Sequence, residues 1–255
     1  MYLPVPSQPD CASAWRAAVR AVDREPGHSA HNVIIDVVDP TTNATRRDDA
    51  RVAVVDDFLS GCGKSVEAVA NTIFPAALYR RHGAPAFFDV FLHKVLPKVC
   101  RNERWSGYYF ERMIQHPTPR GEVNQLQDIV QRMRDQRALN KFELVLFDPA
   151  RDVDNSRYGG QCLSFLSFKV QPGAPRTLML TAIYRNHFYI EKLLGNLVGL
   201  GRLMAFVARE GGLNVGALTV VSTHATIDMP KGVGRADIGA MVARFDQAAT
   251  HPLAA

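Results

Sequence analysis

Cysteine is scarce in this 255-residue chain, and its distribution excludes two kinds of stabilising site. The sequence has four cysteines, at positions 11, 62, 100 and 162, and no two of them form a C-x-x-C pair. Structural zinc sites bring closely spaced cysteines and histidines together, and disulfide-rich scaffolds use cysteine at a much higher density. We therefore expect no metal site, no disulfide framework and reduced thiols.

Long apolar runs are also missing. No stretch approaches the ~20 apolar residues that a membrane-spanning helix needs, and no charged and then apolar signal stands at the start. Hydrophobic residues make up 47% of the chain and charged residues 22%, which is ordinary for a globular protein. These absences predict a cytoplasmic protein without a membrane partner.

A strong charge imbalance is absent as well. The formal net charge is +5 at neutral pH, and the basic residues do not gather in blocks. A modest positive charge suits an anionic small-molecule substrate, whereas dense basic patches are typical of nucleic-acid binding. We expect no nucleic-acid partner.

One short stretch, DDFLSGCGKS at residues 56–65, is close to a phosphate-binding P-loop. It follows an apolar run and precedes a helical pattern, as strand, glycine-rich turn and helix do in that motif. The motif needs a glycine at the position of Phe58, because backbone N–H groups wrap the phosphates there. We therefore favour a helix N-cap at Ser60 or Ser65. The alternative is a kinase-like site in which Lys64 and magnesium bind phosphate.

The hydrophobic pattern predicts a single α/β domain over residues 1–255. Helical spacing of apolar residues predicts helices over 65–81, 85–99, 122–136 and 190–209. Runs rich in β-formers predict strands over 31–40, 51–59, 141–149, 161–170, 177–185 and 217–228. The strands 161–170 and 177–185 are joined by a Pro-Gly turn, so we expect an antiparallel hairpin. No repeat or clear linker interrupts this order, which favours one domain.

Side chains that carry chemistry stand at the ends of four consecutive elements in the C-terminal half. Cys162 begins one strand and Arg185 and Asn186 end the next, while Asn196 lies on the following helix and His224 near the end of the last strand. An arginine beside a cysteine favours the thiolate, which is the nucleophilic form of that side chain. If these ends converge, they form a pocket with a cysteine nucleophile.

The stretch QCLSFLSFKV and the later run LMLTAIYRNHFYIEKLLGN resemble the core of folate-dependent thymidylate synthase, a family that includes the pyrimidine-nucleotide hydroxymethylases. In that family a strand ending in arginine is followed by a helix whose asparagine lies eleven residues after the arginine, and Arg185 and Asn196 have this spacing. His224 matches a histidine on a later strand of the family. Upstream, YYFERMIQHPTPRGEVNQLQDIV is similar to a tyrosine-led segment, which places Tyr109 on the active-site tyrosine. The resemblance covers about residues 108–228.

The resemblance implies an architecture and an assembly. The fold would be of thymidylate-synthase type, with a twisted mixed sheet covered by helices. Two copies would form a homodimer through the sheet, and each site would be completed across that interface. Lys141 falls near the position at which the partner subunit lends an arginine to the substrate phosphate, so the resemblance assigns it a phosphate contact.

The resemblance also implies one-carbon transfer to C5 of a pyrimidine nucleotide or a related heterocycle. Cys162 would add to C6 and make C5 nucleophilic, and Tyr109 would assist removal of the C5 proton. The implied one-carbon donor is 5,10-methylenetetrahydrofolate, and the product carries a methyl or a hydroxymethyl group.

Four further residues would bind the nucleotide. Arg185 would hold the phosphate with Asn186 beside it, Asn196 would bind the N3/O4 edge of the base, and His224 would contact the ribose. Because an amide both donates and accepts hydrogen bonds, Asn196 favours a uracil-like edge over a cytosine-like one.

The chain departs from the family most strongly on the folate side. Phe188 stands at the aspartate that anchors the pterin, and Lys192 stands at a glycine four residues later. Further family positions are changed at Gln161, Leu163, Asn186 and Thr226. Other family residues that bind phosphate or activate the folate have only nearby candidates, at Arg46, Arg47, Glu67 and Trp105. These losses favour a specialised biosynthetic role over housekeeping thymidylate synthesis.

A function from a different class stays open, that of a catalytically idle descendant that binds a nucleotide or a protein partner. Such a protein needs only Arg185 and Asn196 for binding. Each site residue also has a purely structural interpretation, with Cys162 as a small buried hydrophobic residue, Asn196 as a local helix cap and His224 as a satisfied core histidine. Arg185 would then form a surface ion pair, and Lys141 would be a solvated charge. Reaction of Cys162 with a substrate distinguishes the two functions.

Overall fold

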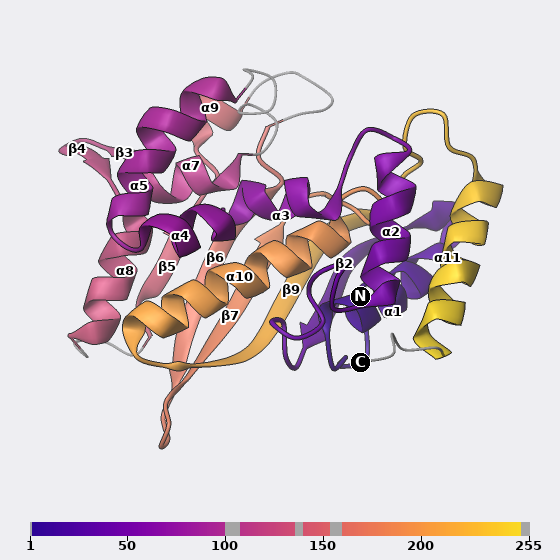
Figure 1. Ribbon diagram of the computed structural model, residues 1–255, viewed down its shortest axis with the longest axis horizontal. Helices are drawn as coiled ribbons and strands as arrows, with labels where there is room; N and C mark the ends of the chain where they lie inside the picture. Colours follow the sequence, from indigo (N-terminus) through magenta and orange to yellow (C-terminus); the bar gives the residue numbers. More distant parts are fainter. Residues whose placement is uncertain (1, 100–107, 136–139, 154–159, 251–255) are drawn as a thin grey trace.

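The computed structural model describes residues 2–99, 108–135, 140–153 and 160–250, and a mixed sheet with helices packed against it dominates the fold (Figure 1). The strands are β1 (Leu3–Pro4), β2 (Ser29–Val37), β3 (His116–Thr118), β4 (Gly121–Val123), β5 (Phe142–Val145), β6 (Leu163–Gln171), β7 (Thr177–Tyr184), β8 (His187–Phe188) and β9 (Asn214–Thr226). The helices are α1 (Cys11–Asp23), α2 (Ala50–Ser60), α3 (Val66–Ile73), α4 (Ala76–His82), α5 (Ala86–Val90), α7 (Tyr109–Ile114), α8 (Gln125–Arg134), α9 (Pro149–Asp152), α10 (Leu193–Gly211) and α11 (Arg235–Thr250). The expected α/β class and helix-covered mixed sheet are confirmed, whereas the thymidylate-synthase fold itself and the dimer remain predictions.

The order of strands gathers the predicted site at one edge of the sheet. The order is β1–β2–β9–β7–β6–β5, and β8 lies beside β9. β7 runs antiparallel to β6 and parallel to β9, and α10 makes the crossover that a parallel pair needs. The start of β6 therefore lies beside the ends of β7 and β9. The predicted 161–170 and 177–185 hairpin is confirmed.

The two faces of the sheet differ in how well they are covered. One row of paired residues, which faces the helices, is fully buried: Ile35, Val220, Ala182, Leu166 and Leu144. The helices α3, α8 and α10 lie in front of the sheet in Figure 1. In the neighbouring row on the opposite face, Ile34, Val221, Ile183 and Phe165 are only partly buried and Val145 is exposed. The next row on that face is polar: Asp36, Thr219, Thr181, Ser167 and Glu143. The second face is therefore mixed in character and incompletely covered by this chain.

The central helix α10 is buried on most of its surface, as expected for a helix that is apolar all round. It packs closely against α3 through two glycines. A Cβ atom on Gly195 would lie 2.5 Å from the Cβ of Val69, and one on Gly199 would lie 2.8 Å from the carbonyl oxygen of Ala70. This close contact fixes the helix that carries Asn196.

The strand predicted over 51–59 is wrong, because these residues form helix α2. Val52, Val55 and Leu59 are buried at helical spacing, and the Asp49 carboxylate accepts a hydrogen bond from the Arg51 N–H at the helix start. Burial on one face therefore outweighs the β-propensity of the valines.

The loss of that strand also removes the structural context of a P-loop. The glycine-rich stretch joins two helices, and Lys64 forms an ion pair with Glu191. The N-cap prediction is right for Ser65, whose Oγ accepts from the Ala68 N–H at 3.0 Å. It is wrong for Ser60, which ends α2 and donates to the Asp56 carbonyl.

Two predicted helices are interrupted. The helix expected over 65–81 is divided into α3 and α4 at Phe74 and Pro75, because proline lacks the N–H that would continue the helix. The helix expected over 85–99 begins as α5 and continues as a π-helical turn (Phe91–Val95) and a 3-10 turn (Leu96–Lys98).

Four helices were not predicted at all, namely α1, α7, α9 and α11, and two of them, α1 and α11, pack together. The Asp10 carboxylate caps α1 through the Ser13 N–H at 2.7 Å. The fully buried ring of Trp15 lies 5.0 Å from the ring of Phe245 on α11. None of the helices in the described ranges is long and apolar enough to cross a membrane.

Candidate functional site

Cys162 and Arg185 are neighbours across the β6/β7 hairpin. Leu163 pairs with Tyr184 in the ladder, so the residue before β6 meets the residue after β7. The Arg185 N–H donates to the Cys162 carbonyl at 2.9 Å, and the Arg185 Nε donates to the Gln161 carbonyl at 2.8 Å. The predicted closeness of the cysteine and the arginine is present in the fold.

Opposing effects act on the Cys162 thiol. Burial raises its pKa above the ordinary value, and the nearby positive charges of Arg185 and Lys192 lower it, but burial has the larger effect. The free protein therefore holds Cys162 mainly as a thiol near neutral pH. The two positive charges stabilise the thiolate and so favour its formation when the side chain reacts.

Lys192 is a candidate site residue that the sequence analysis missed. It precedes α10, its side chain is half-buried, and that side chain makes no hydrogen bond or ion pair with the residues that the structure describes. Burial lowers its pKa, and the neighbouring charge of Lys64 lowers it further, while Glu191, Cys162 and Asp228 raise it. The sequence analysis treated Lys192 only as the loss of a family glycine. The same change adds a positive charge at that position, and this added charge could have identified Lys192 as a site residue.

Replacing Lys192 by methionine is expected to raise the pKa of Cys162, because the thiolate loses one of its two cations. Alkylation of Cys162 at pH 8 should then slow by up to about ten-fold, which corresponds to one pKa unit. The measurement is the pH profile of iodoacetamide labelling at this residue. Lys169→Met is the matched control, because Lys169 pairs with Glu143 at the far end of the hairpin. An unchanged profile in the Lys192 variant would contradict the assignment.

Tyr109 begins α7 and is buried against the same edge. Burial raises the pKa of its phenol, and the charge of Cys162 raises it further, while hydrogen bonds from the backbone N–H groups of Leu163 and Cys162 lower it. The hydroxyl therefore lies at the Cys162 backbone and stays protonated at neutral pH, so it can donate or relay a proton.

Two buried polar side chains beside Cys162 have no hydrogen-bond partner in the described part of the chain. They are Gln161, at both atoms of its amide, and Tyr184, at its hydroxyl. A buried polar group without a partner costs about 1–3 kcal/mol. Such groups are available to a polar ligand, and sequence reasoning identified neither of them as a site residue.

The side chain of Asn186, between β7 and β8, contacts that of His224 on β9. The His224 Nδ1 lies 2.6 Å from the Asn186 Oδ1, which only accepts, so the ring proton is on Nδ1. The Nε2 then accepts from the Ser29 hydroxyl at 3.3 Å. Burial lowers the pKa of His224, and His31 beside it lowers it further, so the ring is neutral at physiological pH. The structure brings these two predicted residues together.

Asn196 is buried in the first turn of α10. Its Nδ2 lies 2.9 Å from the Nε2 of His187, which also is buried. The side chain bonds to another element, so the interpretation as a local helix cap does not describe it.

Lys141 does not join this group within the chain. It precedes Phe142, which pairs with Phe168 on β6, whereas Cys162 precedes the opposite end of that strand. The offset along β6, from Phe168 to Cys162, is about 20 Å at the usual rise per residue. A phosphate contact by Lys141 would therefore have to come from a second copy, as the resemblance implies.

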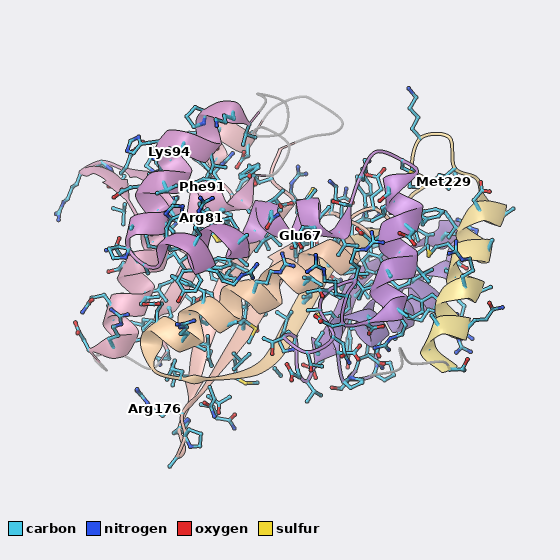
Figure 2. All side chains as sticks on the ribbon, in the orientation of Figure 1. Glu67, Arg81, Phe91, Lys94, Arg176 and Met229 are labelled. Carbon is cyan, nitrogen blue, oxygen red and sulfur yellow. The ribbon has the colours of Figure 1, made fainter. Side chains whose placement is uncertain are left out.

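The described candidates for the family's folate contacts and for its early arginine loop do not reproduce the family's pattern. Phe188 is paired in β8 with Thr226 and offers no carboxylate to a pterin. Glu67, which Figure 2 shows on α3, pairs with Arg202 at 2.6 Å, and Arg46 pairs with Asp56 and Asp57. Trp105 lies outside the described residues. Within the ranges that the structure describes, no hydrogen bond joins Arg47 to Cys162. The family's mode of folate binding does not fit the residues present.

Two hollows lie elsewhere on the protein. Two cavities of about 280 and 640 Å³ lie between α1 and α11, and both are lined by Arg16, Arg20 and Arg24. No lining residue belongs to the group around Cys162. We locate the site by its chemistry, because the groups able to react or bind are at the edge of the sheet. The described residues contain no group of three or more metal-ligating side chains.

Comparison with known proteins gives distant matches of one kind. A protein of Methanocaldococcus jannaschii named "Putative thymidylate synthase" is 24% identical over 129 residues, which cover 49% of this chain and 57% of that protein. Proteins of the same name are 30% identical over 105 residues in Methanothermobacter thermautotrophicus and 31% identical over 111 residues in Methanopyrus kandleri. The latter two matches cover 41% and 42% of this chain and 45% and 51% of those proteins.

The chain therefore spans about half the length of the curated relatives it matches. No protein-family model matches it. The similarity, at 24–31% identity over about half the chain, supports a distant relationship to thymidylate-synthase-like proteins.

Proposed function

We propose that this chain is a one-carbon transferase that acts at C5 of a pyrimidine nucleotide or a related heterocycle through a covalent adduct with Cys162. One observation carries the proposal. Cys162 lies beside Arg185, Lys192 and the Tyr109 hydroxyl at one sheet edge, in a chain distantly related to thymidylate-synthase-like proteins.

The chemistry follows from the ring. The Cys162 thiolate forms a bond to C6, and the electron pair of the C5–C6 double bond moves onto C5 and the C4 carbonyl. C5 then attacks an electrophilic one-carbon donor. A base removes the C5 proton, with the Tyr109 hydroxyl relaying it, and the electron pair of that bond expels the amine of the donor and leaves an exocyclic methylene on C5. Addition of water to the methylene, with departure of the thiolate and return of the ring double bond, gives the hydroxymethyl product. Addition of hydride from a reduced donor of the tetrahydrofolate type, which is thereby oxidised, gives the methyl product. In this scheme the product is a methyl or a hydroxymethyl pyrimidine in a specialised biosynthetic pathway.

Binding uses the remaining groups at the edge. Arg185 and Lys192 hold the phosphate, because both carry positive charge next to Cys162. Asn196 reads the base, while His224 and Asn186 contact the ribose as a pair. We also propose that two copies pack through the partly covered face of the sheet, which would bring Lys141 of one copy to the site of the other.

The test is intact-protein mass spectrometry after incubation with 5-fluoropyrimidine nucleotides. Fluorine at C5 cannot leave as a proton does, so an adduct that has taken up the one-carbon unit is trapped. Methylenetetrahydrofolate is the first donor to include, in parallel with reactions that lack it. A mass gain of nucleotide plus folate establishes the nucleophile and the donor. A gain of nucleotide alone establishes the nucleophile with a different donor.

The second candidate is a catalytically idle protein that binds a nucleotide. The raised pKa of Cys162 favours it, because a protonated thiol is a poor nucleophile. Binding of nucleotide without any mass gain, measured by calorimetry on the same samples, would support this candidate and overturn the transferase.

A further inference from the structure

Asn196 is held by a buried histidine that the proposed chemistry does not use. The Asn196 and His187 side chains meet at 2.9 Å, and the two residues are 3% and 2% exposed. No hydrogen bond to the Asn196 Oδ1 is found within the described ranges. One end of the amide is therefore engaged by His187, and the rest of its hydrogen-bonding capacity is left for a ligand.

The His187 ring is itself fixed on three sides. Its Nδ1 lies 3.0 Å from the Ser222 Oγ, and the Tyr189 hydroxyl donates to the same oxygen at 3.3 Å. The ring is stacked on Tyr184, with ring centres 4.0 Å apart and an interplanar angle of 11°. Burial lowers the pKa of His187 to about 3, so the ring is neutral and has one N–H donor and one acceptor nitrogen.

The placement of the protons follows from these contacts. The Asn196 Nδ2 only donates, so the His187 Nε2 accepts and the ring proton is on Nδ1, where Ser222 accepts it. A reversed amide would need the ring proton on Nε2 and the Ser222 hydroxyl donating to Nδ1, so the amide orientation and the ring tautomer change together. In the structure the amide has its nitrogen toward His187 and its oxygen away from it.

We propose that His187 is a positioning residue that locks the Asn196 amide in the orientation that selects 4-oxo pyrimidines over 4-amino pyrimidines. This inference rests on the proposed function, which makes Asn196 the residue that reads the base. A uracil-type edge has an N3–H donor for the free Oδ1 and an O4 acceptor for the second Nδ2 hydrogen. A cytosine-type edge has an N3 acceptor and an amino donor, and it would need the reversed amide.

The test compares uracil and cytosine nucleotides in calorimetric binding to the full chain. The unsubstituted protein should bind the uracil nucleotide at least about ten-fold more tightly than the cytosine nucleotide. The factor corresponds to the cost of one mispaired buried hydrogen bond in the cytosine complex. His187→Gln offers Asn196 either a donor or an acceptor, so the preference should fall about ten-fold, toward parity. If His187 had only a structural role, the substitution would weaken the binding of both nucleotides equally. The ratio of the two affinities would then be unchanged, and this result would overturn the proposal.

Tyr189→Phe is the matched control. It removes a buried hydroxyl from the same group but leaves the contact between His187 and Asn196, so the preference should not change. A preference of the unsubstituted protein for the cytosine nucleotide would also overturn the proposal.

A second measurement needs no ligand. The ring ¹⁵N chemical shifts of His187 should show a protonated Nδ1 and an unprotonated Nε2. The opposite tautomer would overturn the proposal even if both nucleotides bind, and it decides the matter if His187→Gln does not fold. If neither nucleotide binds the unsubstituted protein, the proposed function fails, and the tautomer still reports separately on the orientation of the amide.

Discussion

A Cys162→Ser variant is expected to form no covalent adduct with any 5-fluoropyrimidine nucleotide. A serine hydroxyl is far less acidic than a thiol, so Arg185 and Lys192 cannot make it an effective nucleophile. Turnover should fall by roughly a thousand-fold or more, as it does when a covalent nucleophile is removed. Nucleotide binding should persist, because the phosphate and base contacts come from other side chains. The measurements are intact mass and single-turnover kinetics.

Cys62→Ser is the control for this experiment. Cys62 is also half-buried and free, but it lies between α2 and α3. The adduct should form on this variant as on the unsubstituted protein. An adduct that persists in Cys162→Ser and disappears in Cys62→Ser would show that Cys62 is the nucleophile. That result would contradict the proposed mechanism.

The second large effect is expected from Gly195→Ala. The added Cβ would lie 2.5 Å from the Val69 Cβ and 2.9 Å from the Val66 carbonyl oxygen, so α3 and α10 must move apart. Overpacking of this kind costs about 1–3 kcal/mol in the free energy of unfolding. Because Asn196 follows directly, nucleotide binding should weaken as well. Urea-induced unfolding and calorimetry measure the two effects.

Gly239→Ala makes the same chemical change where there is room. Gly239 is exposed on α11, and a Cβ there would meet no atom within 4 Å. Alanine is the better helix former by about 1 kcal/mol, so this variant should be more stable. Equal stability changes of the same sign in both variants would contradict the packing argument.

Part of the fold could be read from the sequence because its pattern is local. The β6/β7 hairpin, α8 and α10 follow from alternation, turn residues and helical spacing in short windows. The helix α2 did not follow, since its valines favour a strand and only the burial of one face decides otherwise. The polar N-terminal segment concealed α1, whose helical state depends on Trp15 packing against the distant Phe245.

The site residues also divide into those that local sequence predicts and those that depend on the folding of distant segments. The closeness of Cys162 and Arg185 followed from strand ends and from the resemblance. Sequence spacing could not show that His187 engages Asn196, because that contact depends on how the turn after β7 folds back onto α10. Lys192 was visible only as a departure, and its nearness to Cys162 needed three-dimensional coordinates.

The hairpin and the N-terminal strand also differ in when they can form during folding. Cys162 and Arg185 meet through a hairpin whose strands are close in sequence, whereas the Ser29 and His224 contact joins residues 195 positions apart. Loop-closure entropy favours the near contact, and long-range pairing is intrinsically slower. Cys162 and Arg185 are therefore expected to meet early, and the contact between Ser29 and His224 is expected to form late, when β2 docks along β9. The order of folding then places the hairpin ahead of the rest of the proposed binding site.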